Sequence, residues 1–173
     1  MPVTPFHYPL AYVLSKVDKR LSLPGVVVGA MVSDLEIPLI ILFFPDQFPN
    51  NRLVLHSLLG GATVGAILAM MLTIYLYSHV VSAVFKIQKD LIKVKTHFSV
   101  PLAISCIIGT SSHVLLDILT HQENPVFWPV QTTISSPICP YQASLPVHAV
   151  LAASLLILLI INRKNVLNEI LVG

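Results

Sequence analysis

The sequence predicts an all-α, polytopic membrane protein, folded as a helical bundle. Of its 173 residues, 55% are hydrophobic and only 10% are charged, whereas a soluble domain carries about 25% charged residues. The mean hydropathy is +0.82, and several apolar runs reach the roughly 20 residues that a helix needs to cross a bilayer. These observations exclude a disordered chain, a coiled coil and an ordinary soluble enzyme. The net charge of +2 is too small and too scattered for a nucleic-acid-binding protein.

We expect one integral-membrane domain, residues 1–173, with an N-terminal helix followed by four spans. The N-terminal helix, residues 8–20, is expected to be amphipathic or half-spanning, because it is short and ends in basic residues. The four spans are predicted, from the apolar runs, at residues 23–44, 53–77, 98–119 and 144–161.

Two of these spans carry internal signals. Pro38 interrupts the first span and predicts a kink near residues 34–38, because proline cannot donate the usual helical hydrogen bond. In the second span, Gly61 and Gly65 lie four residues apart. Small residues at this spacing allow helix backbones to approach each other closely.

The distribution of basic residues predicts the orientation in the plasma membrane. Lysine and arginine cluster at residues 16–20, 86–95 and 163–164, whereas the connections at 45–52 and 120–143 contain only Arg52. Basic connections usually face the cytoplasm. We therefore expect these three clusters inside and the 120–143 loop outside.

Ionisable residues occur inside the apolar runs, where each charge costs about 2.5–3.5 kcal/mol on insertion scales. They are Asp34, Glu36, His56, His113 and Asp117. The predicted spans hold no lysine or arginine that could offset the acids, which leaves protonation, water or a bound cation. Because neutral imidazole and carboxylate are standard zinc ligands, a cation also explains the histidines.

The predicted topology brings five candidate ligands to one layer in the outer half of the bilayer. His113 and Asp117 are four residues apart, share one helix face and lie near the end of a span that runs outward. His56 lies near the start of a span that runs inward. Asp34 lies about 16 Å along its helix from residue 23, and His7 about 20 Å from residue 20. We therefore predict a metal centre of His7, Asp34, His56, His113 and Asp117, most simply for zinc, with manganese or iron also suited to these ligands.

Four segments together resemble a known group of proteins. They are TPFHYPLAY, GAMVSDLEIP, RLVLHSLLGG and HVLLDILTHQENPVFWPV. In this order they resemble the small prokaryotic membrane-bound metal-dependent hydrolase families, which are in turn similar to zinc-dependent phospholipase C. We expect one or two zinc ions, and the resemblance implies a two-metal cluster in which Asp117 would bridge. Asp34, His56 and His113 would complete one ion, and His7 would help to hold the other.

The sequence differs from those families at two positions, since Ser33 stands where they usually have proline and Glu36 where aspartate is frequent. The resemblance includes no clear set of ligands for a third metal, although His121, Glu123 and His148 are candidates.

The leading functional hypothesis is metal-dependent hydrolysis of a lipid-like phosphoester or related ester, with a membrane lipid as substrate. Asp34 or Glu36 would accept the proton of the attacking water, and Ser57 and Thr120 are candidates for orienting the ligands. Three alternatives stay open. They are an intramembrane amide hydrolase of the ceramidase kind, a metal-ion transporter, and a scaffold whose polar core or structural metal fixes the packing.

Overall fold

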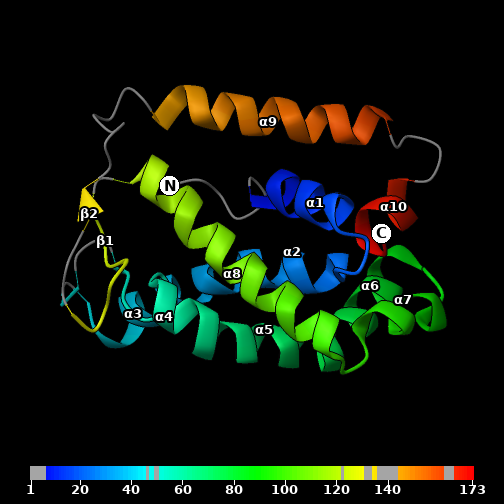
Figure 1. Ribbon diagram of the computed structural model, residues 1–173, viewed down its shortest axis with the longest axis horizontal. Coiled ribbons are helices and arrows are strands. Elements are labelled where there is room, and N and C mark those ends of the chain that lie inside the picture. Colours follow the sequence, from blue (N-terminus) through cyan, green and yellow to red (C-terminus); the bar gives the residue numbers. More distant parts are fainter. Residues whose placement is uncertain are drawn as a thin grey trace.

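The computed structural model describes residues 7–45, 47–48, 51–121, 123–130, 134–135, 144–161 and 166–173. These residues form an elongated bundle of helices, with one small pair of strands at one end (Figure 1). The helical elements are α1 (Tyr8–Val17), α2 (Leu23–Val32), η2 (Ser33–Leu35), α3 (Glu36–Phe43), α4 (Leu58–Gly60), η4 (Gly61–Gly65), α5 (Ala66–Leu72), η5 (Thr73–Tyr77), α6 (Ser78–Phe85), α7 (Lys89–Thr96), α8 (Val100–Thr120), α9 (Ser144–Ile161) and α10 (Val166–Leu171). Strands β1 (Glu123–Asn124) and β2 (Ile134–Ser135) pair antiparallel.

The all-α membrane class is confirmed. Among the described residues, three continuous helices are long and apolar enough to cross a membrane, at Leu23–Phe43, Leu58–Phe85 and Val100–Thr120. The fourth predicted span is the helix α9, whose described apolar part, Pro146–Ile161, is shorter than a typical span.

The second span differs from its predicted limits at both ends. Residues 53–57 are not helical, and the helix begins at Leu58 after Ser57, whose hydroxyl accepts a hydrogen bond from the Gly60 amide as an N-cap. The helix then continues through π-helical stretches to Phe85 and ends where Lys86 adopts a left-handed conformation. The apolar run therefore predicted the span, but hydrogen bonding decided its limits.

The N-terminal helix is shorter than predicted and two further helices are present. Helix α1 ends at Val17, and Asp18 follows with an extended backbone. Helix α7 lies inside the lysine-rich connection, and α10 follows α9.

The helix of the first span is locally irregular near the kink predicted at residues 34–38. The chain tightens into the short 3₁₀ turn η2 between α2 and α3. Pro38 has no amide hydrogen to donate to the carbonyl oxygen four residues earlier, so a regular α-helix cannot be maintained here. The turn brings Glu36 to the buried side of the chain.

Helices α2 and α8 cross closely enough to place their backbones in contact. A Cβ atom built on Gly29 would lie 2.7 Å from the Cys106 carbonyl oxygen and 3.1 Å from the Gly109 Cα. The Cβ of any larger residue at position 29 would therefore overlap the backbone of α8. Gly61 and Gly65 make looser contacts with α8 at Thr110, as expected from their spacing.

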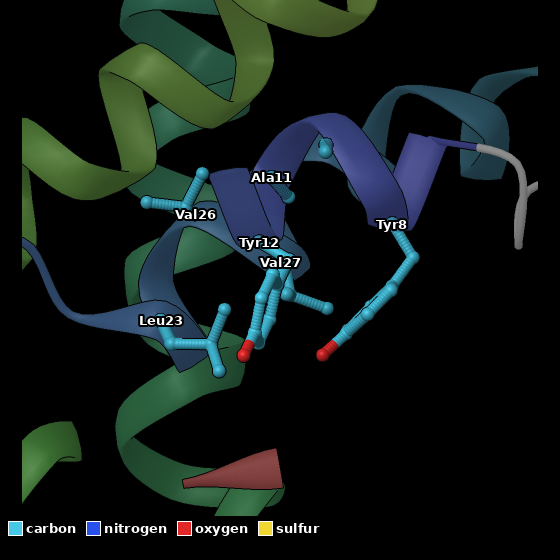
Figure 2. Packing of buried hydrophobic residues seen from close by; sticks show 7 residues of the cluster. Tyr8, Ala11, Tyr12, Leu23, Val26 and Val27 are labelled. Carbon is cyan, nitrogen blue, oxygen red and sulfur yellow. The ribbon is translucent and has the colours of Figure 1, made fainter. Parts of the chain in front are cut away.

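Helix α1 packs on α2 through a cluster of buried apolar side chains. Figure 2 shows Tyr8 and Tyr12 from α1 beside Leu23 and Val27 from α2. The Tyr8 hydroxyl also donates to the Ile170 carbonyl oxygen of α10 at 2.8 Å. This packing fixes the start of α1, and therefore His7, against the remainder of the bundle.

Candidate metal centre

The predicted ligands come together at the end of the bundle that carries β1 and β2. His7 immediately precedes α1, Asp34 lies in η2, and His56 lies in the non-helical segment before α4. His113 and Asp117 lie one turn apart on α8. Two sets of three side chains place one possible ligand atom each within 4.8 Å of one another. These sets are His7, His113 and Asp117, and Asp34, His56 and His113.

The imidazole of His113 is held with one nitrogen toward the site. Its Nδ1 lies 2.7 Å from the carbonyl oxygen of Ala30, which can only accept a hydrogen bond. Nδ1 therefore carries the hydrogen, and in the neutral ring the lone pair is on Nε2. Nε2 faces Asp34 Oδ1 at 3.6 Å and Asp117 Oδ2 at 3.5 Å.

His56 is held in the same way by Glu36. Its Nδ1 lies 2.8 Å from Glu36 Oε2, so the carboxylate accepts the Nδ1 hydrogen. The Glu36 carboxylate also accepts hydrogen bonds from the backbone amides of Leu53, Val54 and Leu55, at 3.0, 2.7 and 3.1 Å. Glu36 thus fixes both the non-helical segment and the ring orientation of His56.

The ring orientations of His56 and His113 leave buried acceptor atoms without a hydrogen-bond donor among the described residues. The Nε2 atoms of both rings are buried, and neither they nor the Asp117 oxygens have a hydrogen-bond partner among the described residues. Lone pairs of nitrogen face carboxylate oxygens at 3.5–3.9 Å. A cation between them would satisfy all of these acceptors, and imidazole and carboxylate suit zinc.

The two carboxylate oxygens of Asp117 face different histidines. Oδ2 lies 3.5 Å from His113 Nε2 and 3.9 Å from His56 Nε2, whereas Oδ1 lies 3.9 Å from His7 Nε2. A carboxylate placed in this way can contribute one oxygen to each of two ions. Because the one lone pair of His113 Nε2 can bind only one ion, the second ion would depend on His7 and Asp117.

His7 is buried at the start of α1, and its ring stacks on that of His113 with centroids 4.1 Å apart. Burial lowers the pKa of His7 to about 4, and the neighbouring His113 acts in the same direction. The imidazole is therefore neutral near pH 7, which is the form that binds metals.

Arg52 is part of the site, which the sequence argument missed. It is 97% buried, with its Nε 3.4 Å from Asp117 Oδ2 and a terminal nitrogen 2.8 Å from His121 Nε2. The expectation that no basic residue compensates the acids is thus wrong, because Arg52 folds inward from a predicted loop. Three carboxylates, of Asp34, Glu36 and Asp117, against one guanidinium leave two negative charges, which one divalent cation would balance.

His121 and Asn124 support Asp117 and were also not assigned this role from the sequence. The His121 Nε2 accepts from Arg52, so its Nδ1 carries the hydrogen and lies 3.3 Å from Asp117 Oδ1. Asn124 donates through Nδ2 to the Asp117 backbone carbonyl oxygen at 2.9 Å. Arg52 begins the segment RLVLHSLLGG, which was the available signal for it, but no pattern in the sequence pairs it with Asp117.

The candidates for orienting the ligands, Ser57 and Thr120, and those for a third metal remain to be placed in the structure. Ser57 caps α4 and donates to the Val54 carbonyl oxygen, whereas Thr120 contacts His121 Nδ1 at 3.0 Å. In the described part of the chain, His121, Glu123 and His148 form no third cluster of possible ligands.

Comparison with known proteins places the chain in a family of membrane proteins. No curated protein and no solved structure gives a significant match. The family model described as YdjM inner membrane protein matches residues 8–172. This match covers almost the whole chain, including every candidate ligand except His7, and it agrees with the long apolar helices. The chain therefore belongs to the YdjM inner membrane protein family, a family of bacterial membrane proteins.

Proposed function

We propose that the protein is a membrane-embedded, metal-dependent hydrolase of lipid-like phosphoesters. The observation that carries the proposal is the group of buried, unpartnered acceptors. The Nε2 atoms of His56 and His113 present lone pairs to Asp117 Oδ2 at 3.9 and 3.5 Å, and none of these atoms has a hydrogen-bond partner among the described residues. A core that only fixed helix packing would pair these atoms, because an unsatisfied buried polar group costs about 1–3 kcal/mol.

Asp34, His56, His113 and Asp117 would hold the first ion, and His7 with the other oxygen of Asp117 would contribute to a second. A zinc ion bound there acts as a Lewis acid and lowers the pKa of water. Manganese or iron suits the same nitrogen and oxygen donors. Glu36 and the Ala30 carbonyl oxygen keep the two imidazoles in the binding tautomer.

Arg52 favours a phosphoester over an amide or a carboxylic ester. A guanidinium presents donors in a planar fork that matches phosphate oxygens. In Arg52, Nε faces Asp117 and one terminal nitrogen contacts His121, so the other terminal nitrogen would contact an anionic phosphoryl group beside the candidate ligands. Neutral amides, the substrates of ceramidase-like enzymes, would gain nothing comparable from this charge.

Asp34 is the best candidate for the group that accepts a proton from water. Its side chain is 18% exposed, against 3% for Asp117 and 9% for Glu36, whose oxygens are occupied by three amides and His56. The general-base role, considered for both acids, is thus assigned to Asp34, and Glu36 becomes a positioning residue. Next to Asp34, exposed apolar side chains of Leu35 and Leu39 face outward, which suits a lipid substrate that arrives laterally.

The packing below the site favours an enzyme over a metal-ion transporter. Val32, Ala66, Ala69, Leu102 and Cys106 form a buried apolar cluster between α2, α5 and α8. On α8 the cluster includes Leu102 and Cys106, which precede His113 along the helix. Leu102, the member farther from the site, lies about 16 Å from His113. A transport path would need polar groups on both sides of the ligands.

Metal content and turnover of the purified protein test the proposal together. We expect one or two transition-metal ions per chain by mass spectrometry of the metals, and hydrolysis of a p-nitrophenyl phosphodiester or monoester in detergent micelles. A chelator should abolish hydrolysis, and added zinc should restore it.

His113→Ala should lose metal and activity, whereas His97→Ala should retain both. His97 is a matched control because it is exposed and belongs to neither ligand set. Equal metal content in the two variants, or a parent protein without metal, would contradict the proposed centre. Metal binding with no phosphoester turnover would leave a structural metal and contradict the enzyme.

A further inference from the structure

A second polar feature lies at the opposite end of the bundle from the candidate metal centre. A cavity of about 190 Å³ is lined by residues from the end of α1, the start of α2, the end of α7 and the C-terminal Gly173. Figure 1 shows these segments, with α10, at the end of the bundle opposite β1 and β2. The lining of the cavity includes Lys16, Lys19 and Lys95 together with the apolar side chains of Leu21 and Leu23. This volume suits one small polar group rather than a drug-sized ligand, which needs about 300 Å³ or more.

Among the described residues, two of the three lysines have no acidic partner. Lys16 pairs with Glu169 of α10 at 3.0 Å, and the nearby Asp18 is occupied by Arg20 at 2.7 Å. Within the ranges that the structure describes, neither Lys19 nor Lys95 forms an ion pair. The cavity therefore presents two uncompensated ammonium groups from different elements, one after α1 and one on α7.

The position of the cavity along the spans is that of a lipid headgroup. Leu23, which lines it, is the first residue of the first membrane-crossing helix, and Val100 begins the helix that follows α7. Close in sequence to the lysines that line the cavity, Val17, Val94 and Phe98 are exposed apolar residues. Ammonium groups next to an apolar outer surface match a molecule that carries a phosphate on acyl chains.

We propose that this basic cavity binds the phosphate of an anionic phospholipid, with Lys19 and Lys95 contacting the phosphate and Val17, Val94 and Phe98 contacting the acyl chains. The ligand is held at a site separate from the candidate metal centre. The lysine-rich connection thus contributes one side of a lipid site.

Thermal unfolding of the purified full chain in a zwitterionic detergent tests this site. Titration with phosphatidylglycerol should raise the melting temperature in a saturable way, and phosphatidylcholine should not. The double variant Lys19→Gln/Lys95→Gln should bind phosphatidylglycerol about 25-fold more weakly, because each lysine near anionic lipid contributes about a fivefold factor.

The control is Lys89→Gln/Lys93→Gln, which removes the same charge from exposed positions of α7 outside the cavity. It should bind phosphatidylglycerol as the parent does. Equal stabilisation by phosphatidylcholine, an equal loss in the control, or an unchanged affinity in the Lys19/Lys95 variant would overturn the site. Stabilisation by inorganic phosphate at the same concentrations would overturn the lipid as its ligand.

Discussion

Replacement of Glu36 by glutamine tests whether the buried network exists to orient a metal ligand. In the parent protein, Glu36 Oε1 accepts from the amides of Val54 and Leu55, and Oε2 accepts from the Leu53 amide and His56 Nδ1. A glutamine oxygen can replace only one of these two acceptors. Its NH₂ group would face either two backbone amides, or one amide and the His56 Nδ1 hydrogen.

The loss of stability expected for Glu36→Gln follows from the hydrogen-bond donors that are left without an acceptor. One buried unpaired donor costs about 1–3 kcal/mol, so the melting temperature should fall while the helices are retained. To accept the glutamine NH₂, the His56 ring must move its hydrogen from Nδ1 to Nε2, which removes the lone pair that faces Asp34 and Asp117. Loss of such an orienting partner reduces metal affinity by about 10–100-fold.

Competition with a chelator of known zinc affinity measures this change on purified protein. Glu169→Gln is the matched control, because it removes the same charge from an exposed pair with Lys16 at the other end of the molecule. The control should bind zinc as the parent does. If Glu36→Gln keeps the parent zinc affinity, Glu36 does not orient His56 for a metal, and the reasoning from tautomers is refuted.

Three further results are expected. Asp117→Asn should lose more metal than Glu36→Gln, measured by metal content at matched expression, because a ligand oxygen shared by both proposed ions is removed; a milder effect would exclude the bridging role. Arg52→Gln should keep metal but raise KM for a phosphodiester at least tenfold, and an unchanged KM would contradict phosphate recognition by this residue. Gly109→Ala should lower stability by about 1–3 kcal/mol or more in thermal unfolding, because its Cβ would overlap the Val26 carbonyl oxygen; an unchanged melting temperature would contradict the close α2–α8 crossing.

Orientation in the membrane is a separate expectation. A cysteine at position 131, after replacement of Cys106 and Cys139, should be labelled by an impermeant reagent in intact cells, because the basic connections predict an external 120–143 loop. Position 131 lies outside the described residues. Labelling only after lysis would reverse the proposed topology.

The sequence by itself determined the membrane class, the approximate spans and the set of candidate ligands. Long apolar runs can be buried only in a bilayer or in a large core, so composition was sufficient for the fold class. The predicted kink at residues 34–38 followed from the chemistry of Pro38. Asp34, His56, His113 and Asp117 followed from the rarity of ionisable groups in such runs, and His7 from its predicted depth. The structure brings all five close together.

Only the tertiary structure decided what surrounds those residues. Arg52 reads as the end of a polar loop, and its burial beside Asp117 depends on a segment that is not helical. That segment is held by three amides donating to Glu36, a contact between positions 17–19 residues apart that no periodicity reveals. The tautomers of His56 and His113 likewise depend on partners from other helices. Hydropathy records how a residue partitions between water and lipid, whereas hydrogen bonds between distant segments decide which polar groups remain for a ligand.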